Sequence, residues 1–351
     1  MALVMIARNE ARCIKRSLLS AKNHVDRMVV LDTGSTDDTV AIARNCGADV
    51  HHFEWTGDFS VARNVALDIA DADWNLVLDA DEWIEEGGES LQEIKTNALS
   101  LGVVLVKSES GSDAQRSENN SWISRLLPRG VHYAGRVHEQ PISDLPKVRV
   151  PLVLGHDGYS ASQLAMKRGR NRPLLLQELQ QNPNEPYVLY QIGKDHEIYD
   201  EFSTASDYYL QAADLLTSSA PYRHELFTRL LYCLSKSERL EQAITIAGEM
   251  MGEWPESPDF FFTVGNLFLD WAILHPEQAL QQWLPMAEAA WLRCLDIGER
   301  PELEGSVVGR GSFLAAHNLA VIYQGLNKSE KAEQYEQLAK SLRNKNSAAM
   351  A

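Results

Sequence analysis

The 351-residue sequence has no excess of positive charge. Its 33 Lys and Arg residues are outnumbered by 49 Asp and Glu residues, so the formal net charge is −16 and the sequence pI is about 5.1. Binding to nucleic acid or to anionic lipid depends on clustered cations, and this balance argues against both. A phosphate-bearing substrate would need a local cation or a metal ion to neutralise it.

Long apolar runs and paired cysteines are also missing. Asp, Glu, Lys or Arg interrupts every apolar stretch that might otherwise span a membrane, and the first ten residues lack the pattern of a signal peptide. The four cysteines are scattered, with no C-x-x-C pair, which favours buried free thiols in a reducing compartment. We therefore expect a cytoplasmic protein without a membrane span.

Strand and helix patterns alternate over the first 80 residues. Apolar runs predict four strands, at 2–7, 27–31, 49–53 and 74–78. The segments between them predict three helices, at 9–23, 35–47 and 59–70. Ser35 and Asp38 resemble a capping box at the start of the second helix, and Gly47 would end it. This alternation predicts a Rossmann-like, mostly parallel sheet covered on both faces.

The region from 102 to 159 has weaker signals. Residues 102–107 predict a fifth strand. Ser, Asn, Asp and Glu dominate residues 108–121, where we expect a mobile loop. This loop is either a lid over a ligand or a plain excursion of the chain. Pro141, Pro146 and Pro151 predict that only short elements follow.

From about Ser162 the patterns are helical and come in pairs. The predicted pairs are 187–199 with 204–216, 222–235 with 240–251, 259–274 with 285–295, and 311–324 with 329–342. Pro186, Pro221 and Pro255 are 35 and 34 residues apart, a period typical of tetratricopeptide helix hairpins. We predict an α/β domain over 1–160 and an all-α helical-repeat domain over 161–351.

The strongest chemical motif is Leu78-Asp79-Ala80-Asp81-Glu82, a D-x-D that follows an apolar strand. Carboxylates spaced in this way can share a hard divalent cation with a diphosphate. An acidic surface turn would give the same letters, but Asp32 ends a second strand of the same sheet. In parallel sheets ligands bind beyond the carboxyl ends of the strands, so Asp32 is a candidate for a nucleobase edge. Asp37 and Asp38 are expected only to cap the next helix.

Four motifs occur in order: Met5-Ile6-Ala7-Arg8-Asn9-Glu10, Asp32-Thr33-Gly34-Ser35-Thr36-Asp37, Asp58-Phe59-Ser60-Val61-Ala62-Arg63-Asn64, and the D-x-D segment. Together they resemble the inverting family 2 glycosyltransferases of GT-A fold. The resemblance implies a nucleotide-sugar donor, first of all a UDP-sugar, and a divalent metal. Several members of that family with these motifs also carry tetratricopeptide repeats, including bacterial peptide S-glycosyltransferases.

The resemblance implies a nucleotide-binding role for residues of the first three motifs. Ala7, through its backbone, and Glu10 would lie beside the nucleoside, and Asp32 would bind the base. Arg63 would reach the nucleotide or its phosphates, since its fixed positive charge suits them. A surface ion pair is the equal alternative for Arg63.

The D-x-D segment would hold the metal. Asp79 would contact the ribose or the metal, Ala80 would line the same cofactor site, and Asp81 would ligate Mn²⁺ or Mg²⁺ directly. His156, in His156-Asp157-Gly158-Tyr159, is the candidate that completes the metal shell, because imidazole accepts Mn²⁺.

A second cluster, Gly135-Arg136-Val137-His138-Glu139-Gln140, is the candidate for acid–base chemistry. An inverting transfer needs a general base that deprotonates the acceptor, and we expect Glu139, with His138 as its rival. Arg136 would stabilise the diphosphate leaving group or pair with Glu139. Trp122 is the expected platform for a sugar ring.

The acceptor and the competing functions stay open. The repeats favour a peptide or protein acceptor, with a surface glycan next, and they equally favour a homodimer. A nucleotidyltransferase would need a Gly-rich basic loop after the first strand, and a dehydrogenase would need G-x-G-x-x-G; neither is present. A repeat scaffold fused to an inactive transferase is the remaining alternative, although the intact acidic motifs argue against it.

Overall fold

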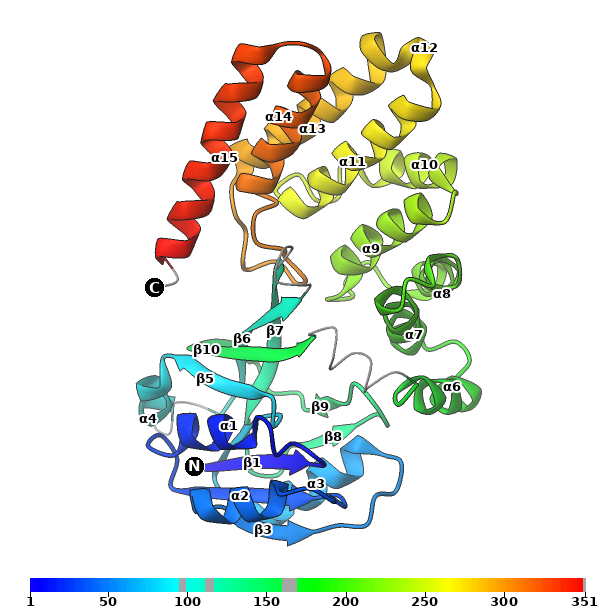
Figure 1. Cartoon of the computed structure of the whole chain (residues 1–351). Coiled ribbons are helices and arrows are strands. Elements are labelled where there is room, and N and C mark those ends of the chain that lie inside the picture. The colour runs from blue at the N-terminus through cyan, green and yellow to red at the C-terminus, as the bar shows by residue number, and fades with distance from the viewer. Residues whose placement is uncertain (95–98, 111–116, 160–168, 350–351) are drawn as a thin grey trace. The chain divides into compact units, whose positions relative to one another are not determined.

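The computed structural model describes residues 1–94, 99–110, 117–159 and 169–349, which form two compact units, Met1–Gln181 and Asn182–Ala351 (Figure 1). The boundary predicted between 160 and 161 falls outside the described residues. The first unit also includes a helix, α6 (Arg172–Gln181). The domain limits 1–160 and 161–351 therefore stay a prediction.

The first unit is built on an eight-stranded sheet in the order β3-β2-β1-β4-β7-β6-β10-β5 (Figure 1). Four of its seven strand pairings are parallel, as the sequence predicts. The parallel half contains β1 (Ala2–Ala7), β2 (Arg27–Asp32), β3 (Asp49–His52) and β4 (Trp74–Val77). The helices between these strands are α1 (Ile14–Ala21), α2 (Thr39–Cys46) and α3 (Phe59–Ala70). The prediction of an α/β unit is thus confirmed.

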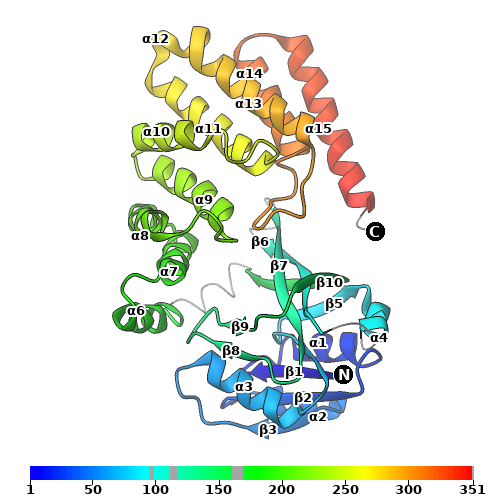
Figure 2. The ribbon, with the colours of Figure 1, turned by 180° about the vertical axis from the view of Figure 1, so that it is seen from behind.

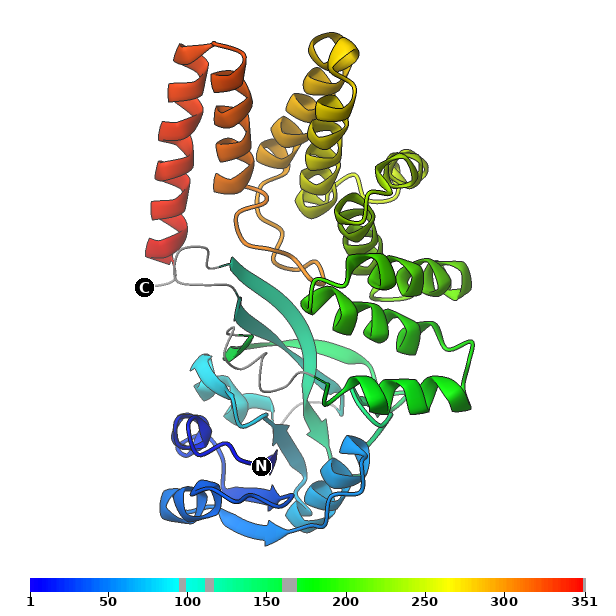
Figure 3. The ribbon, with the colours of Figure 1, turned by 45° about the vertical axis from the view of Figure 1, so that its right-hand side comes forward.

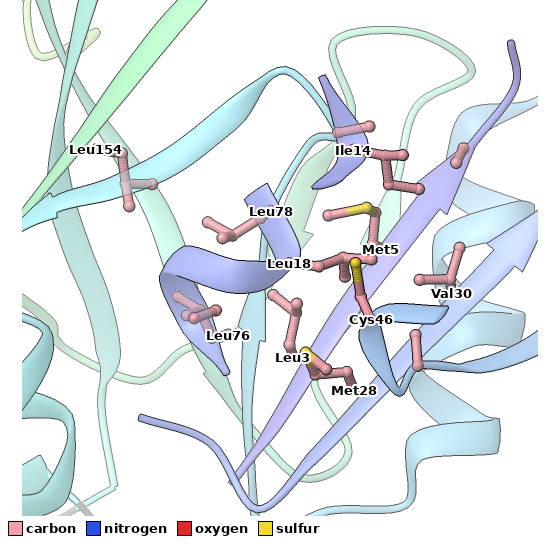
Figure 4. Close-up of a cluster of buried hydrophobic side chains, with 14 of the residues drawn as sticks. Leu3, Met5, Ile14, Leu18, Met28, Val30, Cys46, Leu76, Leu78 and Leu154 are labelled. Atoms are coloured by element: carbon pink, nitrogen blue, oxygen red, sulfur yellow. The ribbon is translucent and has the colours of Figure 1, made fainter. Parts of the chain in front are cut away.

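Both faces of the inner strands β1, β2 and β4 are buried, which explains why these strands are mostly apolar, whereas the edge strand β3 is polar and partly exposed. On one face, Leu3 and Met5 of β1 pack with Ile14 and Leu18 of α1 (Figure 4). On the other face, Ala2 and Val4 pack with small residues of α3. The strands are therefore held rigidly between helices, and their carboxyl ends are fixed at one edge.

The other half of the sheet contains β5 (Glu82–Glu86), β6 (Leu101–Ser110), β7 (Ser117–Pro128) and β10 (Lys147–Tyr159). A two-stranded sheet, β8 (His132–Ala134) with β9 (Gln140–Ile142), and the short helices η1 (Gly88–Ser90) and α4 (Leu91–Ile94) complete this part.

Two sequence predictions in this half are wrong. The expected loop at 108–121 is strand at 108–110 and 117–121, in the antiparallel pair of β6 and β7; residues 111–116 lie outside the described ranges. Pro151 does not break the chain but lies inside β10, where the register shifts between Arg149 and Val153. Proline is tolerated at such an irregularity because it need not donate to the ladder.

The start of α2 also differs from the predicted capping box. Asp38 is at the N-cap position but makes no side-chain capping hydrogen bond, and Ser35 accepts a hydrogen bond from the loop after β1 instead. Asp37 takes the role, because its Oδ1 accepts the N–H of Thr39 at 3.0 Å. Gly47 ends the helix with φ 94°, as predicted.

The second unit consists of helix hairpins (Figures 2 and 3). The pairs are α7 (Pro186–Ile198) with α8 (Phe202–Leu215), α9 (Arg223–Lys236) with α10 (Leu240–Met250), α11 (Pro258–Leu274) with α13 (Leu284–Ile297), and α14 (Phe313–Gly325) with α15 (Ser329–Ala349). The third pair carries an insertion with α12 (Pro276–Gln278) and a π-helical turn, η2 (Ala279–Trp283). All four predicted pairs are present, and each contacts the next.

Two of the hairpins share the same packing contact. A glycine on the first helix leaves room for an aromatic ring on the second, Gly193 for Tyr209 and Gly265 for Trp291. A Cβ added at either glycine would lie 2.5 Å from the ring. This recurrence fits tetratricopeptide-like hairpins, whose small and large residues interlock.

Two further expectations concern the whole chain. All four cysteines are free and buried. None of the helices in the described ranges is both long and apolar enough to cross a membrane.

Candidate functional site

The carboxyl ends of β2, β1 and β4 lie next to one another at one edge of the sheet. Ala7 pairs with Asp32, and β4 pairs with the other side of β1. Asp79 follows β4, so Asp32 and Asp79 are separated by two strand spacings, roughly 10 Å. The two acidic strand ends therefore face the same edge, as the sequence predicts.

Asp32 is held firmly at the end of β2. Its side chain accepts the N–H groups of Gly34 and Ser35 at 3.2 Å, and Oδ2 lies 3.3 Å from Nδ1 of His52. Gly34 has φ 102°, a conformation that favours glycine in this turn. The carbonyl of Ala7 accepts the N–H of Thr33 at 2.9 Å. The first loop and the turn after β2 thus form one surface.

Glu10 is tied to the same surface. Its N–H donates to Oγ1 of Thr39 at 2.8 Å, and its carboxylate accepts the thiol of Cys13 at 3.2 Å. Burial, together with the charge of Glu10, raises the pKa of Cys13, so this thiol stays protonated. Arg12 lies in the same loop and forms two hydrogen bonds to Asp157, at 2.7 and 2.9 Å.

Arg63 connects two of the predicted site residues. From α3 its Nη2 donates to Oδ1 of Asp79 at 2.6 Å, and its Nε donates to Oε1 of Glu139. The Arg63 side chain is 7% exposed, so this is a buried pair and not the surface ion pair given as an alternative. Its Nη1 is buried and has no hydrogen-bond partner among the described residues. Nη1 of Arg63 is therefore an unsatisfied hydrogen-bond donor beside Asp79.

The motif around Arg63 explains how Glu139 reaches the sheet. Asp58 caps α3 by accepting the N–H of Val61 at 3.1 Å. Asn64 exchanges two hydrogen bonds with the backbone of Tyr133, at 2.9 and 2.8 Å. These contacts fasten the segment that leads to Glu139 onto α3, one residue away from Arg63.

Arg136 and His138 are placed differently from Glu139. The backbone of Arg136 accepts the N–H of Phe59 at 2.8 Å and donates to Glu178, and no ion pair joins Arg136 to Glu139 among the described residues. Of the two roles left open for Arg136, the pair with Glu139 is therefore not seen among the described residues, where Arg63 binds Glu139 instead. His138 is exposed and has φ 55°, whereas the Glu139 side chain is only 8% exposed.

Asp79 lies between two guanidinium groups. Arg125 of β7 donates through Nη2 to Oδ2 of Asp79 at 2.8 Å and also to Glu82. Burial alone would raise the pKa of Asp79, but the charges of Arg63 and Arg125 hold that pKa well below its usual range. Burial raises the pKa of Glu82, and Arg125 opposes that shift. Sequence reasoning missed Arg125, which lies in no motif, and gave Glu82 no role.

Asp81 and His156 meet at the neighbouring position. Oδ2 of Asp81 lies 3.5 Å from Nε2 of His156, and Nδ1 of His156 lies 3.0 Å from Oγ of Ser108. The ladder between β5 and β10, which pairs Glu82 with His156, brings them together. Ala80, between the two aspartates, is 5% exposed and packs in the core, so its side chain does not face this edge.

The donor set decides which kind of ion this part of the site could hold. The described residues contain no group of three or more His, Cys, Asp or Glu side chains that could hold an ion by themselves. Asp81 and His156 fit an ion that a bound diphosphate also holds, because Mg²⁺ sites commonly use one or two carboxylates plus substrate phosphates. Trp122 lies on β7, where the guanidinium carbon of Arg149 stacks 4.1 Å from the ring centroid.

Comparisons with known proteins find a family match over the first part of the chain. Residues 2–136 match the family model described as glycosyl transferase family 2. A TPR repeat-containing protein of Synechococcus elongatus is 34% identical over 207 residues, covering 55% of this chain and 51% of that protein. The SPbeta prophage-derived glycosyltransferase SunS of Bacillus subtilis is 29% identical over 246 residues, covering 65% and 57%. An uncharacterized glycosyltransferase of Rickettsia felis is 45% identical over 78 residues, covering 22% and 27%. The chain thus spans about half the length, or less, of these relatives.

Proposed function

Residues 2–136 carry a glycosyl transferase family 2 domain, and from this we propose that the chain transfers a sugar from a nucleotide-sugar, first of all a UDP-sugar, to an acceptor. One observation supports this more than any other. Asp32, Arg63, Asp79, Asp81 and Glu139, which are far apart in sequence, belong to neighbouring elements at the carboxyl edge of one parallel half-sheet. That edge is where such sheets bind nucleotides.

The nucleotide would bind along the surface formed by the first two loops. Asp32 would accept hydrogen bonds from the base, and Glu10 with the backbone of Ala7 would border the nucleoside. Arg63 has a buried donor, Nη1, that no described residue satisfies, which suits a diphosphate oxygen after a small movement.

Asp81 and His156 would hold a divalent cation, Mn²⁺ or Mg²⁺, together with the diphosphate. Both oxygens of Asp79 already accept hydrogen bonds from guanidinium groups, which favours Asp81 over Asp79 as the carboxylate ligand. When bound, the cation would offset the charge that develops on the departing nucleoside diphosphate.

Glu139 would act as the general base. Its Oε1 is bound to Arg63, while Oε2 has no hydrogen-bond partner among the described residues and can take the proton of the acceptor. The deprotonated acceptor would form a bond to the anomeric carbon as the bond from that carbon to the diphosphate breaks, with inversion. His138 is exposed and stays the rival base.

The acceptor would be a peptide or protein, or a surface glycan as the second choice. The helix hairpins of the second unit favour an extended chain as partner, and a homodimer through them stays a prediction. The four buried free cysteines agree with a cytoplasmic location.

Thermal shift with UDP and MnCl₂ tests this proposal. The two together should stabilise the protein by about 2.7 kcal/mol when UDP is at 100 times its Kd, and each alone should do much less. A panel of nucleotide-sugars, scored by slow hydrolysis with Mn²⁺, would then identify the sugar. No response to UDP with Mn²⁺ would contradict the proposal and favour a scaffold without transferase activity.

A further inference from the structure

Strand β7 contains one extra residue, Arg125. Along the antiparallel ladder with β6, Gly102 pairs with Leu126 and Val103 pairs with Ser124, so Arg125 has no partner opposite it. A bulge of this kind turns a side chain out of the regular alternation. Gly102 permits the close approach, since a Cβ added there would lie 2.6 Å from Cβ of Leu126.

The bulge directs the guanidinium of Arg125 into the turn that follows β4. Nη2 donates to Oδ2 of Asp79 at 2.8 Å and to Oε1 of Glu82. Glu82 and Asp79 form a ring of two hydrogen bonds. Oε2 of Glu82 accepts the N–H of Asp79 at 3.0 Å, and the N–H of Glu82 donates to the carbonyl of Asp79 at 3.0 Å. Among the described residues, the hydrogen bonds of the Arg125 side chain go to this turn, and its buried Nε has no partner.

The turn carries Asp81, and the conformation of the turn sets the distance between Asp81 and His156. Oδ2 of Asp81 lies 3.5 Å from Nε2 of His156. Two ligands that are each about 2.1 Å from one ion are separated by no more than about 4.2 Å, so the observed distance suits a shared cation. A change of backbone direction at Asp79 or Glu82 would move Asp81 and lose this match.

Arg63 and Arg125 bind different oxygens of Asp79. Arg63 binds Oδ1 from α3 and Arg125 binds Oδ2 from β7. Each guanidinium keeps one buried nitrogen without a partner among the described residues, Nη1 of Arg63 and Nε of Arg125, but only Arg125 also donates to Glu82. We propose that Arg125 is a positioning residue for the transfer, which fixes the turn from Asp79 to Glu82 so that Asp81 and His156 can bind one cation. This inference rests on the proposed function.

The test measures Mn²⁺ affinity in the presence of UDP, from the electron paramagnetic resonance signal of free Mn²⁺, and needs no turnover. Loss of a residue that orients a metal ligand typically costs about 10- to 100-fold in metal affinity, and we expect a loss in this range for Arg125→Met. Arg125→Lys keeps a cation that can donate to one of the two carboxylates, so it should recover part of the affinity.

Arg229→Met is the matched control. Arg229 of α9 also bridges two carboxylates, Glu197 at 2.9 Å and Glu225 at 2.8 Å, but it lies in the helical unit. It should lower stability and leave the Mn²⁺ affinity unchanged. If Arg125→Met does not fold, as judged by circular dichroism, Arg125→Lys and Glu82→Gln decide the matter.

The two proposals fail in different ways. Wild-type Mn²⁺ affinity in the folded Arg125 variants would overturn the positioning role and leave the proposed function intact. A wild-type protein that binds no Mn²⁺ with UDP would overturn the proposed function and the role of Arg125 with it.

Discussion

Replacing Asp79 by Asn should cost far more stability than replacing Asp81 by Asn, although the two residues are neighbours in one motif. Each oxygen of Asp79 accepts a hydrogen bond from a different guanidinium, at 2.6 Å from Arg63 and at 2.8 Å from Arg125. Oδ2 of Asp81 faces Nε2 of His156 at the longer distance of 3.5 Å. The same chemical change therefore removes the charge that pairs with two guanidinium groups at Asp79, and the charge that faces one imidazole at a longer distance at Asp81.

The size of the effect follows from the burial of the network. Removing one partner of a buried ion pair costs about 3–5 kcal/mol. The Asp79 side chain is 35% exposed, and solvent screening reduces this cost to about 2–3 kcal/mol. At about 2–4 °C per kcal/mol for a unit of this size, Asp79→Asn should lower the melting temperature by roughly 4–12 °C. Asp81→Asn should change the free energy of unfolding by about 1 kcal/mol or less.

Differential scanning calorimetry of the full chain in EDTA measures both variants without bound metal. The transition of the first unit should move in Asp79→Asn and stay near its wild-type position in Asp81→Asn, while the transition of the helical unit serves as an internal reference. Equal melting temperatures for the two variants would refute the assignment of Asp79 as the residue that holds both arginines.

Three further predictions follow from the contacts of single residues. Glu139→Gln should keep UDP binding and lower kcat by about 10²–10⁴-fold, measured by calorimetric titration and a transfer assay; loss of UDP binding as well would make Glu139 structural. Gly193→Ala should destabilise the helical unit by about 1–3 kcal/mol in urea unfolding, because the added Cβ would meet Tyr209. Gly248→Ala, where an added Cβ has nothing within 4 Å, should stabilise the same unit by about 0.5–1 kcal/mol. Equal effects of the two substitutions would contradict the packing of Gly193 against Tyr209. The folded-state pKa of Asp79 is depressed, so the contribution of its charge to stability is present above the unfolded-state pKa of about 3.9 and is lost as the pH falls further. The difference in unfolding free energy between wild type and Asp79→Asn should therefore be constant from pH 6 to 8 and shrink below about pH 4. A difference that grows in acid would contradict this sign.

The parallel half-sheet could be predicted from the sequence because its signals are local. The strand at Ala2–Ala7 and the helix at Phe59–Ala70 begin and end as predicted, since apolar runs and helical spacing are determined by a few adjacent residues. The helix pairs were predictable for the same reason, from their 3.6-residue spacing and recurring prolines.

The remaining errors concern contacts between distant segments. The polar residues at 117–121 form a strand because they pair with β6, which no local propensity encodes. The partner of Glu139 is Arg63, 76 residues away, whereas the sequence offered the nearby Arg136 as one alternative. The contact of Arg125 with Asp79 could not be predicted from the sequence, because it depends on a bulge, that is, on the register of two strands.

A crystal structure of the full chain with UDP and Mn²⁺ tests the central claim most directly, because it locates the base, the diphosphate and the ion together. We expect the base beside Asp32, the diphosphate within reach of Arg63, and Mn²⁺ within about 2.2 Å of an Asp81 oxygen, with Asp79 still bound to both arginines. A nucleotide at another edge of the sheet, or a metal ion bound to Asp79 in place of Asp81, would contradict it.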